Sequence, residues 1–271
     1  MTGDLQSAPV KQEQVPARGI EVRHCHGLAE LERCAQLEKA VWGFDECVPM
    51  PIYVVAAETG GQVLGAFLGE LLVGFTMAMP GLHAEAGLLQ PFLHSHMTAV
   101  LPGYRDRGVG RRLKLFQRED ALARGVKLVE WTFDPLEMRN AHFNFMRLGA
   151  VARRFLPNCY GITSSPLHCG MPTDRLVAEW WLDSPRVRGA LEGSSQAVAG
   201  VDAKRIAVPA RMEAWRSTDR AKAIAEQARI AGEFERLLAQ GYVVTGIENT
   251  REGCEYVLEP WDAVAAALRS P

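Results

Sequence analysis

The sequence lacks any uninterrupted apolar run of about 20 residues, the length that a helix needs to cross the lipid core of a membrane. It also lacks a basic and then apolar leader at its start, so we expect neither a membrane span nor secretion, and we expect the chain in the cytoplasm. No charge of one sign dominates, because 30 Lys and Arg residues stand against 32 Asp and Glu residues, giving a formal net charge of -2. This balance argues against a general role in binding nucleic acid or membrane surfaces.

Cysteine is scarce and follows no pattern. No two cysteines form a C-x-x-C pair, which favours reduced thiols over a disulfide framework or a zinc site in a chain of this length. The alternation His24-Cys25-His26 has no further ligands at a usable spacing, so it indicates a structural strand and we expect no metal. The six cysteines are Cys25, Cys34, Cys47, Cys159, Cys169 and Cys254.

The 271 residues, 48% of them hydrophobic, suffice for one large domain or two small ones. Composition predicts a mobile tail over residues 1–19, a main domain over 20–185, a Gly-, Ser- and Ala-rich linker over 186–204 and a smaller αβ extension over 205–271. We expect this extension to pack on the core or over a substrate cleft. A role in forming a homodimer is the alternative.

The stretch from Phe92 to Gly161 organises the rest of the chain. Residues 94–100 have the composition of a strand, and the turn pair Pro102-Gly103 closes it. An amphipathic helix is predicted from about Val109 to Gly125. Two glycines between a strand and a helix let several backbone N–H groups converge where the helix dipole favours negative charge, so the turn is a candidate phosphate site.

Two nucleotide motifs do not fit this turn. A P-loop needs Lys-Ser or Lys-Thr after its last glycine, but Gly110 is followed by two arginines. A dinucleotide fingerprint that starts at Gly108 needs a third glycine where Leu113 stands. What remains is Arg-x-x-Gly-x-Gly from Arg105 to Gly110, preceded by Val-x-Pro-x-Tyr.

The following segment repeats the alternation of strand and helix. A strand is predicted over residues 127–134 and a short helix over 138–148, which makes a right-handed βαβ crossover. This helix contains Asn140 and closes with Phe145-Met146-Arg147-Leu148-Gly149-Ala150, in which the aromatic Phe145 stands four residues before Gly149. Together the two motifs and their spacing resemble those of the GCN5-related N-acetyltransferases.

The resemblance implies a mixed α/β sheet over about residues 20–185, with the C-terminal αβ extension added to it. The other elements that we expect are strands over residues 20–26, 62–68, 71–79, 153–160 and 175–183, a helix over 27–41, an irregular segment from 42 to 51 and a loop over 80–91. In the extension we expect a strand over 206–208, a helix over 218–240 and a hairpin of 242–247 with 254–258.

The resemblance also implies which residues bind acetyl-CoA or another acyl-CoA. The backbone of Ala99 and Val100 would pair with the pantetheine amides as an added strand does. Asn140 would hydrogen-bond the pantetheine arm and Phe143 would pack beside it. The pyrophosphate would be held by Arg105, Arg107, Gly108, Val109, Gly110 and Arg111, with solvated side chains as the alternative for Arg107 and Arg111.

Acyl transfer from a thioester to an amine needs a group that removes the amine proton, because a lysine-like amine has a pKa of about 10.4. His94 and His96 lie two residues apart on the predicted strand and therefore share a face. They resemble the histidine pair of the serotonin N-acetyltransferase branch, with His96 the slightly stronger candidate. Hydrogen-bonded core histidines are the alternative, and Glu130 is a third candidate base, with a solvated or salt-bridged carboxylate as its alternative.

The departing thiolate gains from a nearby acid, since the pKa of a thiol is about 8.5. Many members of the family have a tyrosine where this chain has Phe145, which has no proton to give. Tyr160 is the candidate substitute, with a buried structural phenol as the alternative. We therefore expect an acyl-CoA-dependent N-acyltransferase, acting with acetyl or succinyl groups on a small-molecule amine or amino acid. A non-catalytic acyl-CoA-binding module and a protein-directed acetyltransferase are the alternatives.

Overall fold

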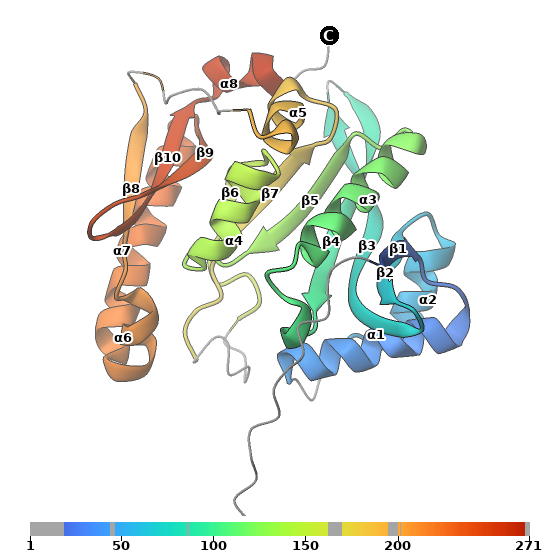
Figure 1. The fold of residues 1–271 in the computed structure, drawn as a ribbon. Helices are drawn as coiled ribbons and strands as arrows, with labels where there is room; N and C mark the ends of the chain where they lie inside the picture. Colours follow the sequence, from blue (N-terminus) through green and yellow to red (C-terminus); the bar gives the residue numbers. More distant parts are fainter. Residues whose placement is uncertain are drawn as a thin grey trace, which may run out of the picture.

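The computed structural model describes residues 19–43, 47–85, 87–161, 170–194, 200 and 202–268. The predicted tail therefore lies outside the described residues, apart from its last position. The described strands form one ten-stranded mixed sheet in the order β1-β2-β3-β4-β5-β7-β6-β9-β10-β8. Helices α3, α4 and α5 line one side of its central strands, and α6 and α7 lie beside β8, at the other end from α1 and α2 (Figure 1). The mixed α/β fold predicted from the sequence is confirmed.

The N-terminal third contributes the first three strands of this sheet, which two helices cover on one face. Strands β1 (Ile20–His24), β2 (Gln62–Leu68) and β3 (Leu71–Glu85) pair in antiparallel fashion. Helix α1 (Gly27–Trp42) and helix α2 (Met50–Glu58) pack on them through one apolar cluster. Helix α2 begins where an irregular segment was predicted. Pro51 occupies its first turn, a position that needs no backbone N–H, so the proline does not break the helix.

The predicted loop over residues 80–91 is wrong, because β3 and β4 (Leu88–Val100) run through it as a long hairpin. Pro80 and Pro91 lie where this hairpin extends past the strands beside it. The ladder with β2 reaches only to Ala78 of β3, and the ladder with β5 starts only at Leu93 of β4. A proline is tolerated in a strand where its missing N–H faces no partner strand. The pairing register shifts between Ser95 and Met97, so His96 is an extra, bulged residue.

The central segment has the predicted crossover. After β4 come a short 3-10 turn, η1 (Pro102–Tyr104), and helix α3 (Val109–Ala123), and then β5 (Leu128–Phe133) returns parallel to β4. Helix α4 (Met138–His142) continues into a π-helical turn, η2 (Phe143–Arg147). The next strand, β6 (Val151–Leu156), does not pair with β5, because β7 (Arg175–Trp181) lies between them.

The C-terminal segment extends the same sheet. Strands β8 (Lys204–Pro209), β9 (Tyr242–Asn249) and β10 (Gly253–Pro260) join it where Ala152 of β6 pairs with Val244 of β9. The helices of this segment are α6 (Met212–Thr218), α7 (Arg220–Ala239) and α8 (Trp261–Leu268). Thirty buried residues of the described chain form one apolar cluster. They come from the central strands, from β8, β9 and β10 and from the helices that pack on them, so the extension packs on the core through a continuous interior.

The prediction of a linker is wrong for its first part, where helix α5 (Pro185–Glu192) stands. The local signals for this helix are complete. Ser184 accepts a hydrogen bond from the backbone of Val187, Pro185 follows it, and Gly193 ends the helix in the left-handed conformation. Residues 195–199 and 201 of the predicted linker lie outside the described residues. Within the part of the chain that the structure describes, no helix is long and apolar enough to cross a membrane.

Candidate functional site

Strands β4 and β5 pair only briefly before they separate. Their parallel ladder consists of Leu93 with Val129 and His94 with Glu130. Beyond these pairs β4 continues to Val100, while β5 continues to Phe133 with β7 as its partner. The edges of β4 and β5 that face each other are therefore unpaired over these last residues, so their main-chain groups are open to an extended ligand.

The alternation of the β4 ladder decides which main-chain groups are open. The amide of Leu101 donates to the carbonyl of Val73 at 2.9 Å, so Val100 and Gly74 form a non-hydrogen-bonded pair. The peptide groups of Val100 and Thr98 therefore face away from β3, and those of Ala99 face β3. Val100 therefore remains a candidate for pairing with the pantetheine amides. Ala99 does not, because its peptide groups face β3, and Thr98 takes its place as the candidate.

The N-terminus of α3 follows this open edge after the short turn η1. Gly108 precedes the helix in the left-handed conformation, with φ 77°, and within the described part of the chain no side chain caps the helix. The first intrahelical bond runs from the amide of Arg112 to the carbonyl of Gly108 at 3.0 Å, which leaves the N–H groups of Val109, Gly110 and Arg111 without intrahelical acceptors. A Cβ atom on Gly108 or on Gly110 would meet nothing within 4 Å. The N-terminus of α3 thus combines N–H groups without intrahelical acceptors with open space beside them.

The arginines of this loop are held in place by specific contacts. Arg105 donates from Nε to the carbonyl of Val100 at 3.1 Å, and Arg111 donates to the carbonyl of Leu191 at 3.0 Å. The guanidinium of Arg107 lies 5.8 Å from the centre of the Tyr104 ring. Carbonyl acceptors are neutral, and among the described residues neither Arg105 nor Arg111 forms an ion pair. Their positive charges therefore add to the favourable field for an anion beside the uncapped helix end.

The two candidate histidines lie side by side. Their ring centroids are 6.0 Å apart, with His94 half-buried and His96 exposed. Burial lowers the pKa of His94 below 6.5, and the nearby charges of His96, Lys114 and Arg154 lower it further. Burial also lowers the pKa of His96, against the opposing effect of Glu38. Both imidazoles are therefore neutral at pH 7 and able to accept a proton.

The other two candidates, Glu130 and Tyr160, lie on the same face of the sheet as His94. Glu130 is the ladder partner of His94, and its carboxylate pairs with Arg154 at 2.6 Å. The side chain of Thr132 lies on the same face of the sheet as that of Glu130, because the two residues are two positions apart on β5. Its hydroxyl lies 2.7 Å from the hydroxyl of Tyr160, which is 50% exposed. The structure thus brings the four predicted catalytic residues to one face, with Glu130 already engaged in an ion pair.

The remaining cofactor candidates lie on α4 and η2. Asn140 is exposed and Phe143 is half-buried against the main apolar cluster. Phe145 is fully buried and makes edge contacts with the rings of Phe133 and Tyr256. It is a core residue, so no proton donor stands at this position.

Sequence reasoning missed a buried acid near His96. Glu38 on α1 accepts hydrogen bonds from the hydroxyl of Tyr53 at 2.6 Å and from the amide of Val48 at 3.0 Å. The hydroxyl of Tyr53 also lies 3.6 Å from Sδ of Met97 on β4. Burial and the neighbouring Glu38 raise the pKa of Tyr53. The available signal was a carboxylate on the apolar stripe of α1, four residues after Cys34.

Two hollows of the described surface lie elsewhere. One, of about 440 Å³, lies beside Trp181 and Leu268, and the other, of about 310 Å³, lies between α4 and the β9–β10 hairpin. Neither is lined by the histidine pair or by the loop before α3. The geometry of the candidate site is therefore that of two separating strand edges and a helix end.

No family model matches the sequence, and no curated protein matches it. Several solved structures resemble the chain at low sequence identity. The ribosomal-protein-S18-alanine N-acetyltransferase from Escherichia coli is 12% identical with a TM-score of 0.48, over 68% of this chain and 97% of that one. NAA60 from Arabidopsis thaliana, in complex with a bisubstrate analogue, is 15% identical with a TM-score of 0.49, over 60% and 98%. The aminoglycoside acetyltransferase meta-AAC0020 from an uncultured soil metagenomic sample is 15% identical with a TM-score of 0.42, over 47% and 86%. These likenesses concern the fold alone.

Proposed function

We propose that the chain is an acyl-CoA-dependent N-acyltransferase that acts on a small amine or amino acid. One observation carries the proposal: the edges of β4 and β5 separate at His94 and Glu130, and β4 leads through the short turn η1 to the uncapped N-terminus of α3. This combination provides main-chain partners for an extended amide arm and N–H donors for a diphosphate. Coenzyme A contains both groups in one molecule.

The described residues fit such a ligand. The N–H groups of Val109, Gly110 and Arg111 would bind the diphosphate in the space left by the missing Cβ atoms of Gly108 and Gly110. The open peptide groups of Thr98 and the amide of Val100 would pair with the pantetheine amides, while the carbonyl of Val100 accepts from Arg105. The charges of the loop arginines add long-range attraction for an anionic ligand.

The thioester would supply an activated carbonyl, and the protein would supply the proton acceptor. His94 and His96 are neutral at pH 7, so either accepts a proton from an ammonium group that approaches this face of the sheet. Glu38 places a negative charge near His96, which favours an incoming cation and the protonated imidazole. An amine acceptor suits these surroundings, and transfer of acetyl or succinyl is compatible with them.

Phe145 supports one competing function. A protein that keeps the phosphate loop but has no proton donor at this position would bind acyl-CoA without turning it over. Release of free thiol, measured across a panel of amines and amino acids, separates the two functions. Turnover with any pair of acyl donor and acceptor excludes the binding module.

The binding site is tested by the change Gly108→Val. The new side chain would fill the open space at the helix end and would force a β-branched residue into positive φ, which costs about 1–2 kcal/mol. We expect acetyl-CoA to bind the unmodified protein in isothermal titration calorimetry and not to bind the variant.

Gly125→Val is the matched control, because Gly125 has the same φ of 77° and also has nothing within 4 Å of its Cβ position. It imposes the same strain at the other end of α3 and should leave binding intact. Equal affinity in the Gly108→Val protein and the unmodified protein would show that the ligand does not use this helix end.

A further inference from the structure

A buried lysine spans the point where β4 and β5 separate. Lys114 of α3 is 5% exposed, and its Nζ donates to Oγ of Ser95 at 2.8 Å and to Oε1 of Gln117 at 2.9 Å. The same ammonium lies 4.1 Å from the centre of the Trp131 ring. Ser95 and Trp131 are the first residues of the two strands beyond their last ladder pair. The ammonium group thus lies at the base of the proposed pantetheine channel, on the α3 side of the sheet.

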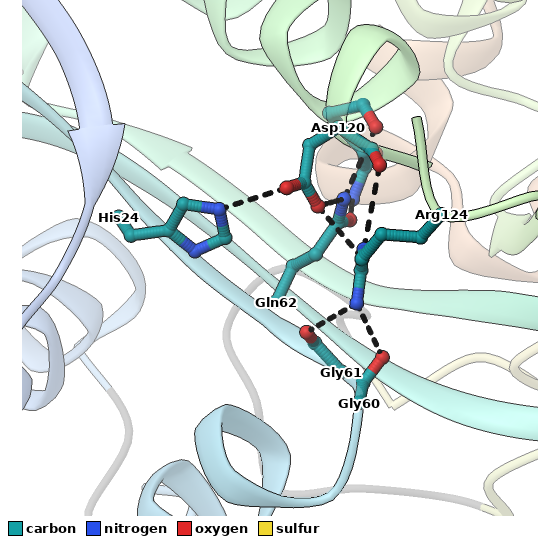
Figure 2. A network of polar contacts seen from close by, with 7 residues as sticks. His24, Gly60, Gly61, Gln62, Asp120 and Arg124 are labelled. Carbon is teal, nitrogen blue, oxygen red and sulfur yellow. Dashed lines mark hydrogen bonds and ion pairs between the residues drawn. The ribbon is translucent and has the colours of Figure 1, made fainter. Parts of the chain in front are cut away.

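Two glutamine side chains connect this lysine to the surface. Gln117 donates to Oε1 of Gln62 at 3.1 Å, and Gln62 donates to Oδ2 of Asp120 at 2.7 Å. Asp120 also pairs with His24 and Arg124, as Figure 2 shows. Because the lysine can only donate and the aspartate can only accept, both amides are oriented with oxygen toward the ammonium. The row from Lys114 through Gln117 and Gln62 to Asp120 therefore compensates the buried charge of Lys114 by the oriented dipoles of the two amides.

The surroundings of Lys114 favour loss of its proton. Burial lowers its pKa to about 7. Among the described residues it makes no ion pair. The titratable groups around it are His94 on β4, whose pKa it lowers, Glu130 on the far face of β5, and Asp120 beyond the two amides. An acid of this strength can protonate a thiolate, whose conjugate thiol has a pKa of about 8.5.

The hydroxyl of Ser95 has an unused donor. Its oxygen accepts the bond from Lys114, and no other described residue is hydrogen-bonded to it. A hydroxyl has one hydrogen to donate as well as two lone pairs. Ser95 is buried, and it lies at the base of the open strand edges where the arm of the proposed ligand would end.

We propose that Ser95 protonates the departing thiolate and that Lys114 restores the proton to Ser95. The inference rests on the proposed acyl transfer, and it supplies the acid that Phe145 cannot supply. When the carbon–sulfur bond breaks, its electron pair goes to sulfur, which takes the Ser95 proton and becomes the free thiol. Ser95 takes a proton from Nζ of Lys114, which is left as a neutral amine and is reprotonated by solvent when the products leave. Ser95 is the catalytic residue, and Lys114 acts through it.

The experiment compares Ser95→Ala, Ser95→Thr and Lys114→Met with the unmodified protein. We expect Ser95→Ala to lower kcat about 100-fold while KM for acetyl-CoA changes less than twofold, as for loss of a general acid. Ser95→Thr keeps the hydroxyl and should restore most of the rate. Lys114→Met should lose rate and also lose the fall of kcat with rising pH that titration of the acid causes in the unmodified enzyme. The exposed Lys127→Met is the control and should change neither.

Calorimetric binding of acetyl-CoA separates this inference from the proposed function. Every Ser95 and Lys114 variant should bind acetyl-CoA with unchanged affinity. If the unmodified protein does not bind it, the proposed function fails. If all variants bind and Ser95→Ala keeps its kcat and pH profile, the proton route fails while the acyltransferase remains.

A second measurement tests the buried ammonium without activity. The folded-state pKa of Lys114, about 7, lies below its ordinary value of 10.5, so between these pH values the unfolded chain binds more protons than the folded one. The free energy of unfolding of the unmodified protein should therefore gain from this group as pH rises from about 7 toward 10.5. Lys114→Met should lack this gain. Equal pH dependence of the two proteins in urea unfolding would overturn the assignment of a proton-releasing lysine.

Discussion

His94 and His96 are two residues apart, yet different charges surround them. Arg154 and Lys114 act on His94 and lower its pKa, whereas Glu38 acts on His96 and opposes the effect of burial. In the proposed reaction, His96 is therefore the stronger candidate for the group that takes the proton of a cationic amine. The opposing effect at His96 comes from Glu38, a buried residue of α1.

The lowered pKa values of His94 and His96 predict how the rate of the proposed reaction depends on pH. Because the pKa of each imidazole is lowered, the proton acceptor is uncharged above about pH 6.5, and the rate should rise as pH increases through a lower value. His96→Ala should lower kcat/KM by about 100-fold and remove this rise. The exposed His26→Ala is the control and should keep the full profile. A rise of unchanged position in the His96→Ala protein would mean that another group takes the proton.

At the scale of single residues, the sequence predicted the positions of those side chains whose face of the sheet follows from the alternation along a strand. His94, Glu130 and the loop from Arg105 to Arg111 lie where the pattern placed them. Glu38 and Lys114 were missed because each is a charged residue on the buried stripe of an amphipathic helix, where the pattern alone indicates an apolar contact. Ala99 was assigned one residue too far along the chain, because hydrogen-bond facing within a strand depends on the ladder register.

Among the elements, α5 shows how closely a helix packs on the turn after η2. A Cβ on Gly149 would lie 2.9 Å from Cβ of Ala190 and 3.0 Å from the Cα of Val187, at a φ of 74°. Only glycine tolerates both the conformation and the contact. The backbone of α5 therefore fixes the end of the segment that carries Phe143 and Phe145.

Gly149→Ala is expected to lower the free energy of unfolding by about 2–4 kcal/mol, through strain at positive φ and the overpacked contact with α5. Gly193→Ala has the same φ of 74° but nothing within 4 Å of its Cβ, so it should lose only about 1 kcal/mol. Chemical unfolding of both variants measures the difference. Equal losses would mean that α5 moves aside and does not fix this turn.

Element prediction succeeded where local signals and packing agree. Helix α3 and strand β5 have clear periodicity and ends, and both were predicted within a few residues. The extension of β3 and β4 through two prolines was not predicted, because tolerance of proline depends on which neighbouring strands are absent. Helix α5 was hidden by the Gly-, Ser- and Ala-rich stretch that follows it, although its capping residues were present in the sequence.

For the whole molecule, the shared sheet and shared cluster predict one cooperative unit. Phe234 of α7 is fully buried, stacked on Phe155 of β6 at 5.6 Å and in edge contact with Tyr256 of β10 at 5.1 Å. The hydroxyl of Tyr256 donates to the carbonyl of Pro135, just after β5, at 2.6 Å. The predicted extension and the main domain therefore stabilise each other.

Phe234→Ala should lower the free energy of unfolding by about 3–5 kcal/mol and shift a single calorimetric transition to lower temperature. The more exposed Ile224→Ala on the same helix should change it by less than about 1 kcal/mol. Two transitions, of which only one moves, would show instead that the extension unfolds separately.

The length, composition and motif order predicted the architecture of the first two thirds of the chain. The continuation of the sheet through β9, β10 and β8 was not predicted, because one ladder pair between β6 and β9 makes the connection. Such a contact between distant segments has no local signature. The packing of the extension on the core was expected, and the main apolar cluster shows how it occurs.

The row from Lys114 to Asp120 gives this protein a way to be tuned from a distance. At its outer end, His24 is partly exposed to solvent. At its inner end, Lys114 contacts β4 and β5 at the point where these strands separate. Since each amide can be satisfied in only one orientation, neutralising the outer carboxylate would reverse or disorder the dipoles behind it. A substitution at the surface end of the row, at Asp120 or His24, would then alter the acidity of Lys114 in the interior of the protein.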